Sequence, residues 1–254
     1  MTDKRPFVFD YNRDDIRYSH HRRADPRIAA LVHSALGPAR SVLNVGAGAG
    51  SYEPDDRYVL AIEPSMTMRS QRGTHLAPAI NAVAESLPFD DKTIDASMAM
   101  VTTHHWTDPQ KGLLEMKRVT RHRVLILTFD PDALDRFWNI DYFPRVVATE
   151  RKRYLPIDKI IASLDSPCEV QPIPIPLDCT DGFQEAFYGR PEAFLDPQVR
   201  RAQSAWGFLD ETQQAAELRQ LTADLASGAW DRKHGQLRTQ PSFIGALRLI
   251  VATL

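Results

Sequence analysis

The chain has 254 residues, of which 43% are hydrophobic and 25% are charged, and its formal net charge is -2. These proportions are typical of a globular protein and exclude a disordered, collagenous or disulfide-rich chain. Acidic and basic residues are interspersed, so the sequence has no basic stripe of the kind that marks a nucleic-acid-binding protein. We therefore expect a small-molecule partner and no nucleic acid.

The chain has two cysteines, Cys168 and Cys179, and neither has the spacing of a metal site or of a disulfide framework. The apolar run at residues 7–9 is too short for a signal peptide, and no stretch is long and apolar enough to span a bilayer. We expect a cytoplasmic protein with reduced thiols, no metal site and no membrane partner. No heptad pattern indicates an oligomeric state.

Strand-like and helix-like apolar segments alternate along the chain up to about residue 175. The predicted strands are residues 41–45, 58–63, 79–82, 94–101, 122–129, 168–175 and 244–252. The predicted helices are residues 25–36, 65–72, 109–120, 134–143 and 158–164. Alternation of this kind predicts an α/β fold with a mostly parallel, seven-stranded sheet.

The strongest local motif is residues 42–50, VLNVGAGAG, in which a strand runs into a loop with glycine at alternate positions. Such a loop lets the backbone approach a ligand and presents amide groups to it. The second predicted strand ends in Glu63, at about the separation that a ribose-binding carboxylate requires. Alternatively, Glu63 is an acid at a helix N-terminus. Ser51 stands where dinucleotide-binding loops have their last glycine, which favours a mononucleoside ligand.

Five segments together carry a resemblance to a known family. They are the loop at 42–50, Glu63-Pro64-Ser65 with Met68, residues 84–89 (AESLPF), Ile94-Asp95, and residues 104–108 (HHWTD). Over residues 40–130 the chain resembles class I S-adenosylmethionine-dependent methyltransferases, particularly the small-molecule group related to the ubiquinone and menaquinone C-methyltransferases. The resemblance implies a Rossmann-like, doubly wound fold. It also implies methyl transfer from S-adenosylmethionine to a small organic acceptor, with S-adenosylhomocysteine as product.

The resemblance also implies which residues hold the cofactor. The glycines of the loop would line its methionine part, Glu63 would hold its ribose, and the main chain of Met100 and Val101 would contact its amino group. Tyr18 and Arg22 lie in a segment that folds over the cofactor in similar enzymes. The predicted cofactor-binding residues are Tyr18, Arg22, Gly46, Ala47, Gly48, Gly50, Glu63, Pro64, Met68, Ala84, Glu85, Met100 and Val101.

Two positions depart from the family pattern near the expected adenine and methionine sites. Asn44 stands where an acidic residue usually opens the glycine motif, and Val83 stands where another acid often precedes Ala84. Asn44 can still accept a hydrogen bond, whereas Val83 cannot contact the adenine amino group through its side chain. Glu85 or the main chain is then left to make that contact.

Residues 181–237 become helical, polar and aromatic before the last strand pattern. A strand ending near residue 175 brings the chain to the carboxyl edge of the sheet, where ligands bind in open α/β folds. We therefore expect this insertion to cover the active site, although a packing subdomain without ligand contact fits the same pattern. The predicted single domain has an N-terminal cover and first helix (1–40), a cofactor-binding core (41–180), a helical lid (181–240) and a last strand (241–254).

Methyl transfer from a sulfonium is an in-line displacement, in which the enzyme mainly holds the nucleophile near the methyl carbon. A base is needed only for some acceptors. His104 is the predicted base, because it follows the fourth predicted strand and titrates near neutrality. The alternative is that His104, His105 and Trp106 simply pack the end of that strand.

The acceptor pocket is expected to combine residues after the fifth predicted strand with aromatic residues of the lid. Aromatic walls with few polar groups suit a flat organic acceptor, and Arg190 between aromatic residues can anchor an anionic one. The predicted substrate-binding residues are His105, Trp138, Tyr142, Tyr188 and Arg190, with Phe129, Asp130, Phe183, Phe187 and Trp206 as further candidates.

Two other functions stay open at this point. A non-catalytic protein that keeps the nucleoside pocket would bind S-adenosylmethionine and transfer nothing. A nicotinamide-dependent oxidoreductase would share the sheet and Glu63, although the glycine spacing does not favour it. Binding of S-adenosylhomocysteine but not of NADH would separate the methyltransferase from the oxidoreductase.

Overall fold

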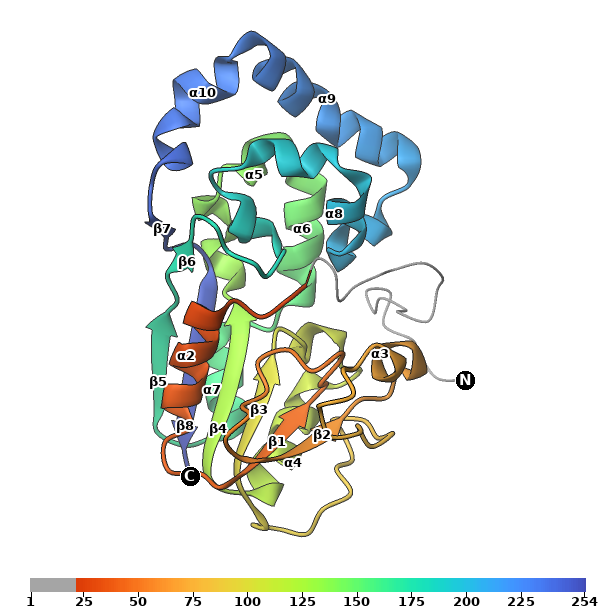
Figure 1. Cartoon of the computed structure of the whole chain (residues 1–254), viewed down its shortest axis with the longest axis vertical. Coiled ribbons are helices and arrows are strands. Elements are labelled where there is room, and N and C mark those ends of the chain that lie inside the picture. Colours follow the sequence, from red (N-terminus) through yellow and green to blue (C-terminus); the bar gives the residue numbers. More distant parts are fainter. Residues whose placement is uncertain (1–21) are drawn as a thin grey trace.

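The computed structural model describes residues 22–254, which form a central sheet, helices on both of its faces and a layer of helices beyond one end (Figure 1). The six strands of the sheet lie in the order β2-β1-β3-β4-β8-β5. Strands β1 to β4 are parallel, whereas β8 is antiparallel to β4 and β5. The strands are β1 (Ser41–Val45), β2 (Tyr58–Ile62), β3 (Ile94–Met100), β4 (Thr120–Phe129), β5 (Cys168–Pro172) and β8 (Leu247–Thr253). The predicted Rossmann-like α/β class is confirmed.

The described sheet has six strands instead of the seven predicted. Residues 79–82 form only one bridge, between Ile80 and Ile62, at the edge of the sheet. Ile80 is 40% exposed, so this short segment has little buried surface to stabilise longer pairing. The predicted strand at 168–175 is divided into β5 and the two-residue β6 (Ile175–Pro176), because Pro172 and Pro174 cannot donate ladder hydrogen bonds.

Helices cover the sheet on both faces because its central strands bury side chains on both. Val42 of β1 packs with Ile28 of α2 on one face, and its neighbour Leu43 packs with Leu113 of α4 on the other. The helices are α2 (Pro26–Ala35), α3 (Met66–Ser70), α4 (Pro109–Val119), α5 (Asn139–Tyr142), α6 (Pro144–Arg153), α7 (Ile157–Leu164), α8 (Pro197–Arg201), α9 (Glu211–Ser227) and α10 (Ala229–His234). None of these helices, within residues 22–254, is long and apolar enough to cross a bilayer.

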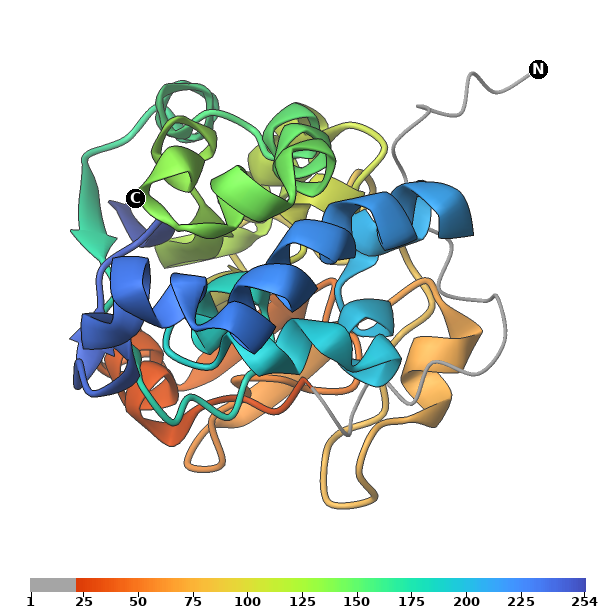
Figure 2. The same cartoon turned by 90° about the horizontal axis from the view of Figure 1, so that it is seen from above.

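A helical cap, which we define as residues 131–153 and 177–241, lies beyond the carboxyl ends of the parallel strands (Figures 1 and 2). Its two segments are joined by an ion pair of 3.0 Å between Arg145 and Glu217. The chain enters and leaves the second segment through a small ribbon of β6 and β7 (Ser242–Phe243). The helix predicted at 134–143 is interrupted at Phe137, which is extended (φ -99°, ψ 134°) and separates the 3-10 helix Pro131–Arg136 from α5.

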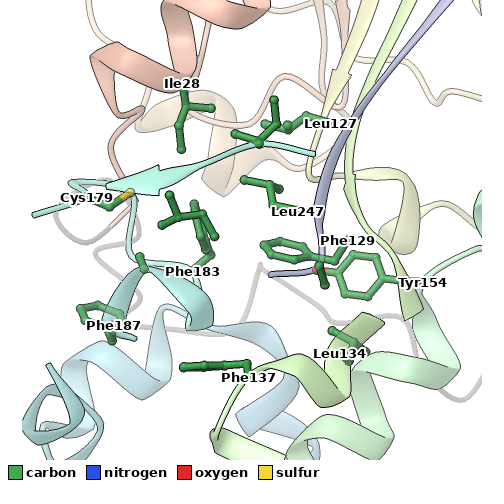
Figure 3. Close-up of a cluster of buried hydrophobic side chains, with 14 of the residues drawn as sticks. Ile28, Leu127, Phe129, Leu134, Phe137, Tyr154, Cys179, Phe183, Phe187 and Leu247 are labelled. Carbon is green, nitrogen blue, oxygen red and sulfur yellow. The ribbon is translucent and has the colours of Figure 1, made fainter. Parts of the chain in front are cut away.

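One hydrophobic cluster continues from the α2 face of the sheet into the helical cap (Figure 3). Leu127 and Phe129 of β4 begin it, and Phe183 follows with its ring centroid 5.4 Å from that of Phe129. Farther into the cap, Trp138 and Trp230 pack edge to face at 5.5 Å. The sheet and the helical cap therefore share one core, and the cap is held against the strand ends.

Two adjacent leucines of α4 test this arrangement, because Leu113 is fully buried and Leu114 is 53% exposed. Leu113→Ala is expected to lower the free energy of unfolding by about 2–5 kcal/mol, since it leaves a cavity between α4 and the sheet. Leu114→Ala is the matched control and should change it by less than about 1 kcal/mol. Urea denaturation measures both values, and equal losses would show that α4 packs differently.

Candidate active site

A cavity of about 1060 Å³ lies at the carboxyl ends of β1, β2 and β3, and we call it the glycine-loop cavity. Most of the predicted cofactor-binding residues come together in its wall. These are Gly46, Ala47, Gly48, Glu63, Pro64, Met68, Ala84, Glu85, Met100 and Val101. Tyr18 lies outside the described residues. The cavity thus gathers segments that are separated by more than 50 positions in the sequence, counting from Ala47 to Met100.

The glycine loop follows β1 with left-handed backbone at all three predicted glycines, where φ is 70° at Gly46, 53° at Gly48 and 100° at Gly50. A β-carbon on Gly46 would lie 2.3 Å from Oγ1 of Thr102, so only glycine fits there. Gly50, also predicted to contact the cofactor, is not among the residues that line the cavity. A β-carbon on Gly50 would instead meet Leu76, so this glycine allows the loop to pack.

Glu63 follows β2 and connects the glycine loop to the start of α3. Its Oε2 accepts a hydrogen bond from the amide of Gly48 at 2.9 Å, and its Oε1 accepts one from the amide of Ser65 at 2.8 Å. Burial raises the pKa of this carboxyl, while both amides stabilise its charged form. Each oxygen keeps a second lone pair that a ligand hydroxyl can use.

Asn44 carries a buried acceptor without a partner in the described part of the chain. Its Nδ2 donates to Oε1 of Glu53 at 3.0 Å, and Glu53 is paired with Arg72. Because a carboxylate only accepts, the amide nitrogen of Asn44 must face Glu53. Its Oδ1 is left buried and unpaired, and Asn44 lines the glycine-loop cavity. An amino group bound there would supply the missing donor.

A second cavity of about 580 Å³ lies between the sheet and the helical cap, and we call it the aromatic cavity. Figure 3 shows several of its rings, contributed by Phe129, Phe137, Tyr154 and Phe183. The complete wall is Arg22, Val101, His104, His105, Phe129, Leu134, Phe137, Asn139, Val147, Glu150, Tyr154, Phe183, Gln184, Glu185, Gln203 and Ser204. The wall is therefore aromatic with an unusually large polar part.

The two cavities meet at Val101 and His105, which line both. Val101 directly follows β3 and has a φ of 51°, a conformation that β-branched residues rarely adopt. Its amide donates to the carbonyl of Leu127 at 2.7 Å, which fixes the turn. A ligand in one cavity is therefore adjacent to a ligand in the other.

Arg22, predicted to bind the cofactor, lines the aromatic cavity and not the glycine-loop cavity. Its Nε donates to Oδ1 of Asp181 at 2.6 Å. The other oxygen of Asp181 accepts from the hydroxyl of Tyr52 at 2.8 Å. This buried network joins the segment before α2 to the helical cap.

Four predicted substrate residues are absent from the walls of both cavities: Trp138, Tyr142, Tyr188 and Arg190. Each is used by the helical cap itself. Trp138 donates to the carbonyl of Tyr188 at 2.8 Å, and Tyr142 donates to Asp224 at 2.9 Å. The Tyr188 hydroxyl and the Arg190 guanidinium donate to main-chain carbonyls. Aromatic side chains gain more from full burial, and these fill the core of the cap.

Comparison with known proteins identifies the family. A family model described as a methyltransferase domain matches residues 43–128. A protein from Anabaena variabilis ATCC 29413, described as a methyltransferase from an antibiotic biosynthesis pathway, is 30% identical, with 93% of this chain and 100% of that chain covered and a TM-score of 0.85. The chain belongs to the S-adenosylmethionine-dependent methyltransferases. Membership of this family argues against the oxidoreductase alternative.

Two further solved structures share the fold of this methyltransferase. A methyltransferase from Thermotoga maritima is 14% identical, with 94% of this chain and 89% of that chain covered and a TM-score of 0.53. One from Bacillus halodurans C-125 is 15% identical, with coverage of 89% and 97% and a TM-score of 0.54. No curated protein matches the chain.

The histidines after β3 occupy different positions in the methyltransferase. His104 lines only the aromatic cavity, where its ring lies 4.5 Å from that of Tyr154 and its Nδ1 has no partner among the described residues. His105 accepts a hydrogen bond of 3.3 Å at Nδ1 from Arg153, since a guanidinium only donates. Burial and the charge of Arg153 hold the pKa of both histidines well below 6.5. Both are therefore neutral at neutral pH.

Several polar residues of the aromatic cavity were not predicted, among them Asn139, Glu150, Glu185 and Gln203. They come from separate segments of the helical cap, and no local motif in the sequence marks them. Within residues 22–254, no three histidine, cysteine, aspartate or glutamate side chains are grouped so that they could hold a metal ion.

Glu185 makes the stability of the methyltransferase depend on pH. Its carboxyl is 3% exposed, and burial raises its pKa from 4.5 to about 7. The stabilisation from this group is complete below pH 4.5 and is lost as the pH rises to about 7, because only the unfolded chain then ionises freely. The loss is about 3 kcal/mol.

Glu185→Gln is expected to remove this part of the pH dependence. The difference in unfolding free energy between the wild type and the variant should fall by about 3 kcal/mol from pH 4.5 to pH 8. Denaturation across this range measures the difference, in which the contributions of the histidines cancel. A constant difference would show that Glu185 ionises in the folded protein as it does in water.

Proposed function

We propose that this methyltransferase transfers a methyl group from S-adenosylmethionine, bound in the glycine-loop cavity, to a small organic acceptor in the aromatic cavity. The observation that carries the proposal is the junction at Val101 and His105, which line both cavities. When bound, S-adenosylmethionine supplies an electrophilic methyl group on a sulfonium. Transfer requires donor and acceptor to be held in line and nearly in contact, and adjoining cavities meet that requirement.

The residues present fit the cofactor. Glu63 would accept hydrogen bonds from the ribose hydroxyls, and the unpaired Oδ1 of Asn44 would accept one from the amino group. Met68 and Ala84 offer apolar contacts to adenine on the wall of the same cavity. The ribose hydroxyls and the amino group of the ligand would thus each meet a side chain with spare hydrogen-bonding capacity.

A small acceptor is favoured because the aromatic cavity is enclosed by the helical cap. Aromatic rings form much of its wall, as they do in many small-molecule sites. His104 is the proposed base for acceptors that must lose a proton, since it is neutral and its Nδ1 is unpartnered. Its lowered pKa makes it a weak base, which suits an acidic acceptor proton.

We propose further that the chain acts as one domain in the cytoplasm, near the ubiquinone and menaquinone C-methyltransferase group. The motifs between residues 42 and 108 support the group, and the free Cys168 and Cys179 support a reducing compartment. The Anabaena variabilis relative, described as part of an antibiotic biosynthesis pathway, supports an organic metabolite as acceptor.

Calorimetric titration with S-adenosylhomocysteine tests the cofactor site. Glu63→Ala is expected to weaken binding by about 100-fold or more, because two charge-assisted hydrogen bonds of about 1.5–3 kcal/mol each are lost. Glu169→Ala is the control, since Glu169 is an exposed carboxylate far from the cavity wall. NADH should not bind. Unchanged binding by a folded Glu63→Ala variant would contradict the proposed site.

A further inference from the structure

Four residues that line the aromatic cavity each carry a buried polar atom without a hydrogen-bond partner in the described part of the chain. These atoms are Nδ1 of His104, Oδ1 of Asn139, Oε2 of Glu185 and Oε1 of Gln203. All four residues line this cavity, and each is less than 10% exposed, with values of 7%, 4%, 3% and 3%. Folded proteins rarely leave buried polar atoms unpaired, so a group of four around one cavity points to a ligand.

The fold fixes the unpaired oxygens as acceptors. The carboxylate of Glu150 accepts from Nε2 of Gln184 at 3.1 Å, so the oxygen of Gln184 faces Nδ2 of Asn139, which donates to it at 2.9 Å. The remaining atom of Asn139 is therefore its oxygen. In the same way, the nitrogen of Gln203 donates to the carbonyl of Gly182, at 3.4 Å, and its oxygen is left over. These oxygens can pair only with a donor.

The charges of the cavity also disfavour an anionic ligand. Glu185 accepts from the amide of Ala246 at 2.7 Å, but no described cation forms an ion pair with it. Glu150 on the wall is paired with Arg153 at 3.4 Å, and Arg22 is paired with Asp181, so Glu185 is the wall carboxyl that has no ion-pair partner in the described part of the chain. The arginine expected to hold an anion, Arg190, does not line this cavity. The unmet need of the wall is therefore for hydrogen-bond donors, and a cationic ligand would in addition favour the charged form of Glu185.

We propose that the acceptor is a flat, neutral or cationic ring compound that carries at least two amino or hydroxyl groups, which Asn139, Glu185 and Gln203 recognise. This inference rests on the proposed function, because it takes the aromatic cavity as the acceptor site. The ring packs against the aromatic wall to which Phe129 and Phe183 contribute. The amino or hydroxyl groups that donate hydrogen bonds to the wall are distinct from the atom that receives the methyl group, which lies at the Val101 junction.

Matched sets of ring compounds test the inference on protein saturated with S-adenosylhomocysteine. Each set contains a donor-bearing member with two amino or hydroxyl groups, an analogue in which one of these groups is blocked by methyl, and a carboxylate on the same ring, for example tyramine, 4-methoxyphenethylamine and 4-hydroxyphenylacetate. Calorimetry should give at least about tenfold tighter binding for the donor-bearing members. Equal or tighter binding of the blocked or carboxylate members, or no binding of any donor-bearing member, would overturn the inference.

Variants of the wall residues test whether these residues cause the preference for donor-bearing ligands. Glu185→Gln and Gln203→Met should each reduce the preference by about tenfold. Gln203→Met changes no charge, and it serves as the test if the Glu185→Gln variant is unstable. Glu192→Gln is the control, because Glu192 is an exposed carboxylate of the helical cap outside the cavity. An unchanged preference in both wall variants would refute the assigned contacts.

The two proposals fail in different ways. Folded protein that does not bind S-adenosylhomocysteine contradicts the proposed function. Protein that binds it and methylates the carboxylate members as fast as the donor-bearing ones supports the proposed function and overturns the substrate class. Transfer of a labelled methyl group from S-adenosylmethionine to each member of the sets provides this second measurement.

Discussion

The turn at Val101 determines how the two cavities are related. The chain leaves β3 there with a φ of 51°, a strained conformation for a β-branched residue that persists only where its surroundings fix it. The amide of Val101 donates a hydrogen bond to the carbonyl of Leu127, so the neighbouring strand β4 fixes this conformation. The turn leads into the short 3-10 helix Thr103–His105, which places His105 beside Val101 on both walls. A single backbone feature of the sheet thus makes the glycine-loop cavity and the aromatic cavity adjacent.

Arg153 links this junction to the helical cap. Its side chain is fully buried and donates from Nη1 to Ser204, at 2.9 Å, and from Nη2 to His105, at 3.3 Å. The first contact reaches the second segment of the cap, and the second holds His105 in the tautomer with its proton on Nε2. The shared hydrophobic core around Phe129 holds the same elements together through burial. Polar and apolar contacts therefore fix the cap over the acceptor side.

The glycine-loop cavity could be predicted from the sequence, whereas the aromatic cavity could not. Glu63 lies within 20 positions of the loop, and parallel strands necessarily bring their carboxyl ends to one edge. The acceptor wall depends on how separate helices pack, and buried polar residues such as Glu185 and Gln203 carry no local motif. We predicted that large aromatic residues such as Trp138 line the acceptor pocket. They are instead buried in the core of the cap, which stabilises them more than exposure at a cavity would. The strain at Val101 also leaves no signal in the sequence.

A crystal structure of the complex with S-adenosylhomocysteine tests most directly the claim that donor and acceptor meet at Val101 and His105. We expect the ribose of the bound S-adenosylhomocysteine to contact Glu63. Its sulfur should lie at the junction of the cavities, in van der Waals contact with Val101 and open toward Phe129. With S-adenosylmethionine bound in the same position, its methyl group would point into the aromatic cavity. A sulfur that faces solvent, or one separated from the aromatic cavity by the side chain of His105, would contradict the claim that donor and acceptor meet at this junction.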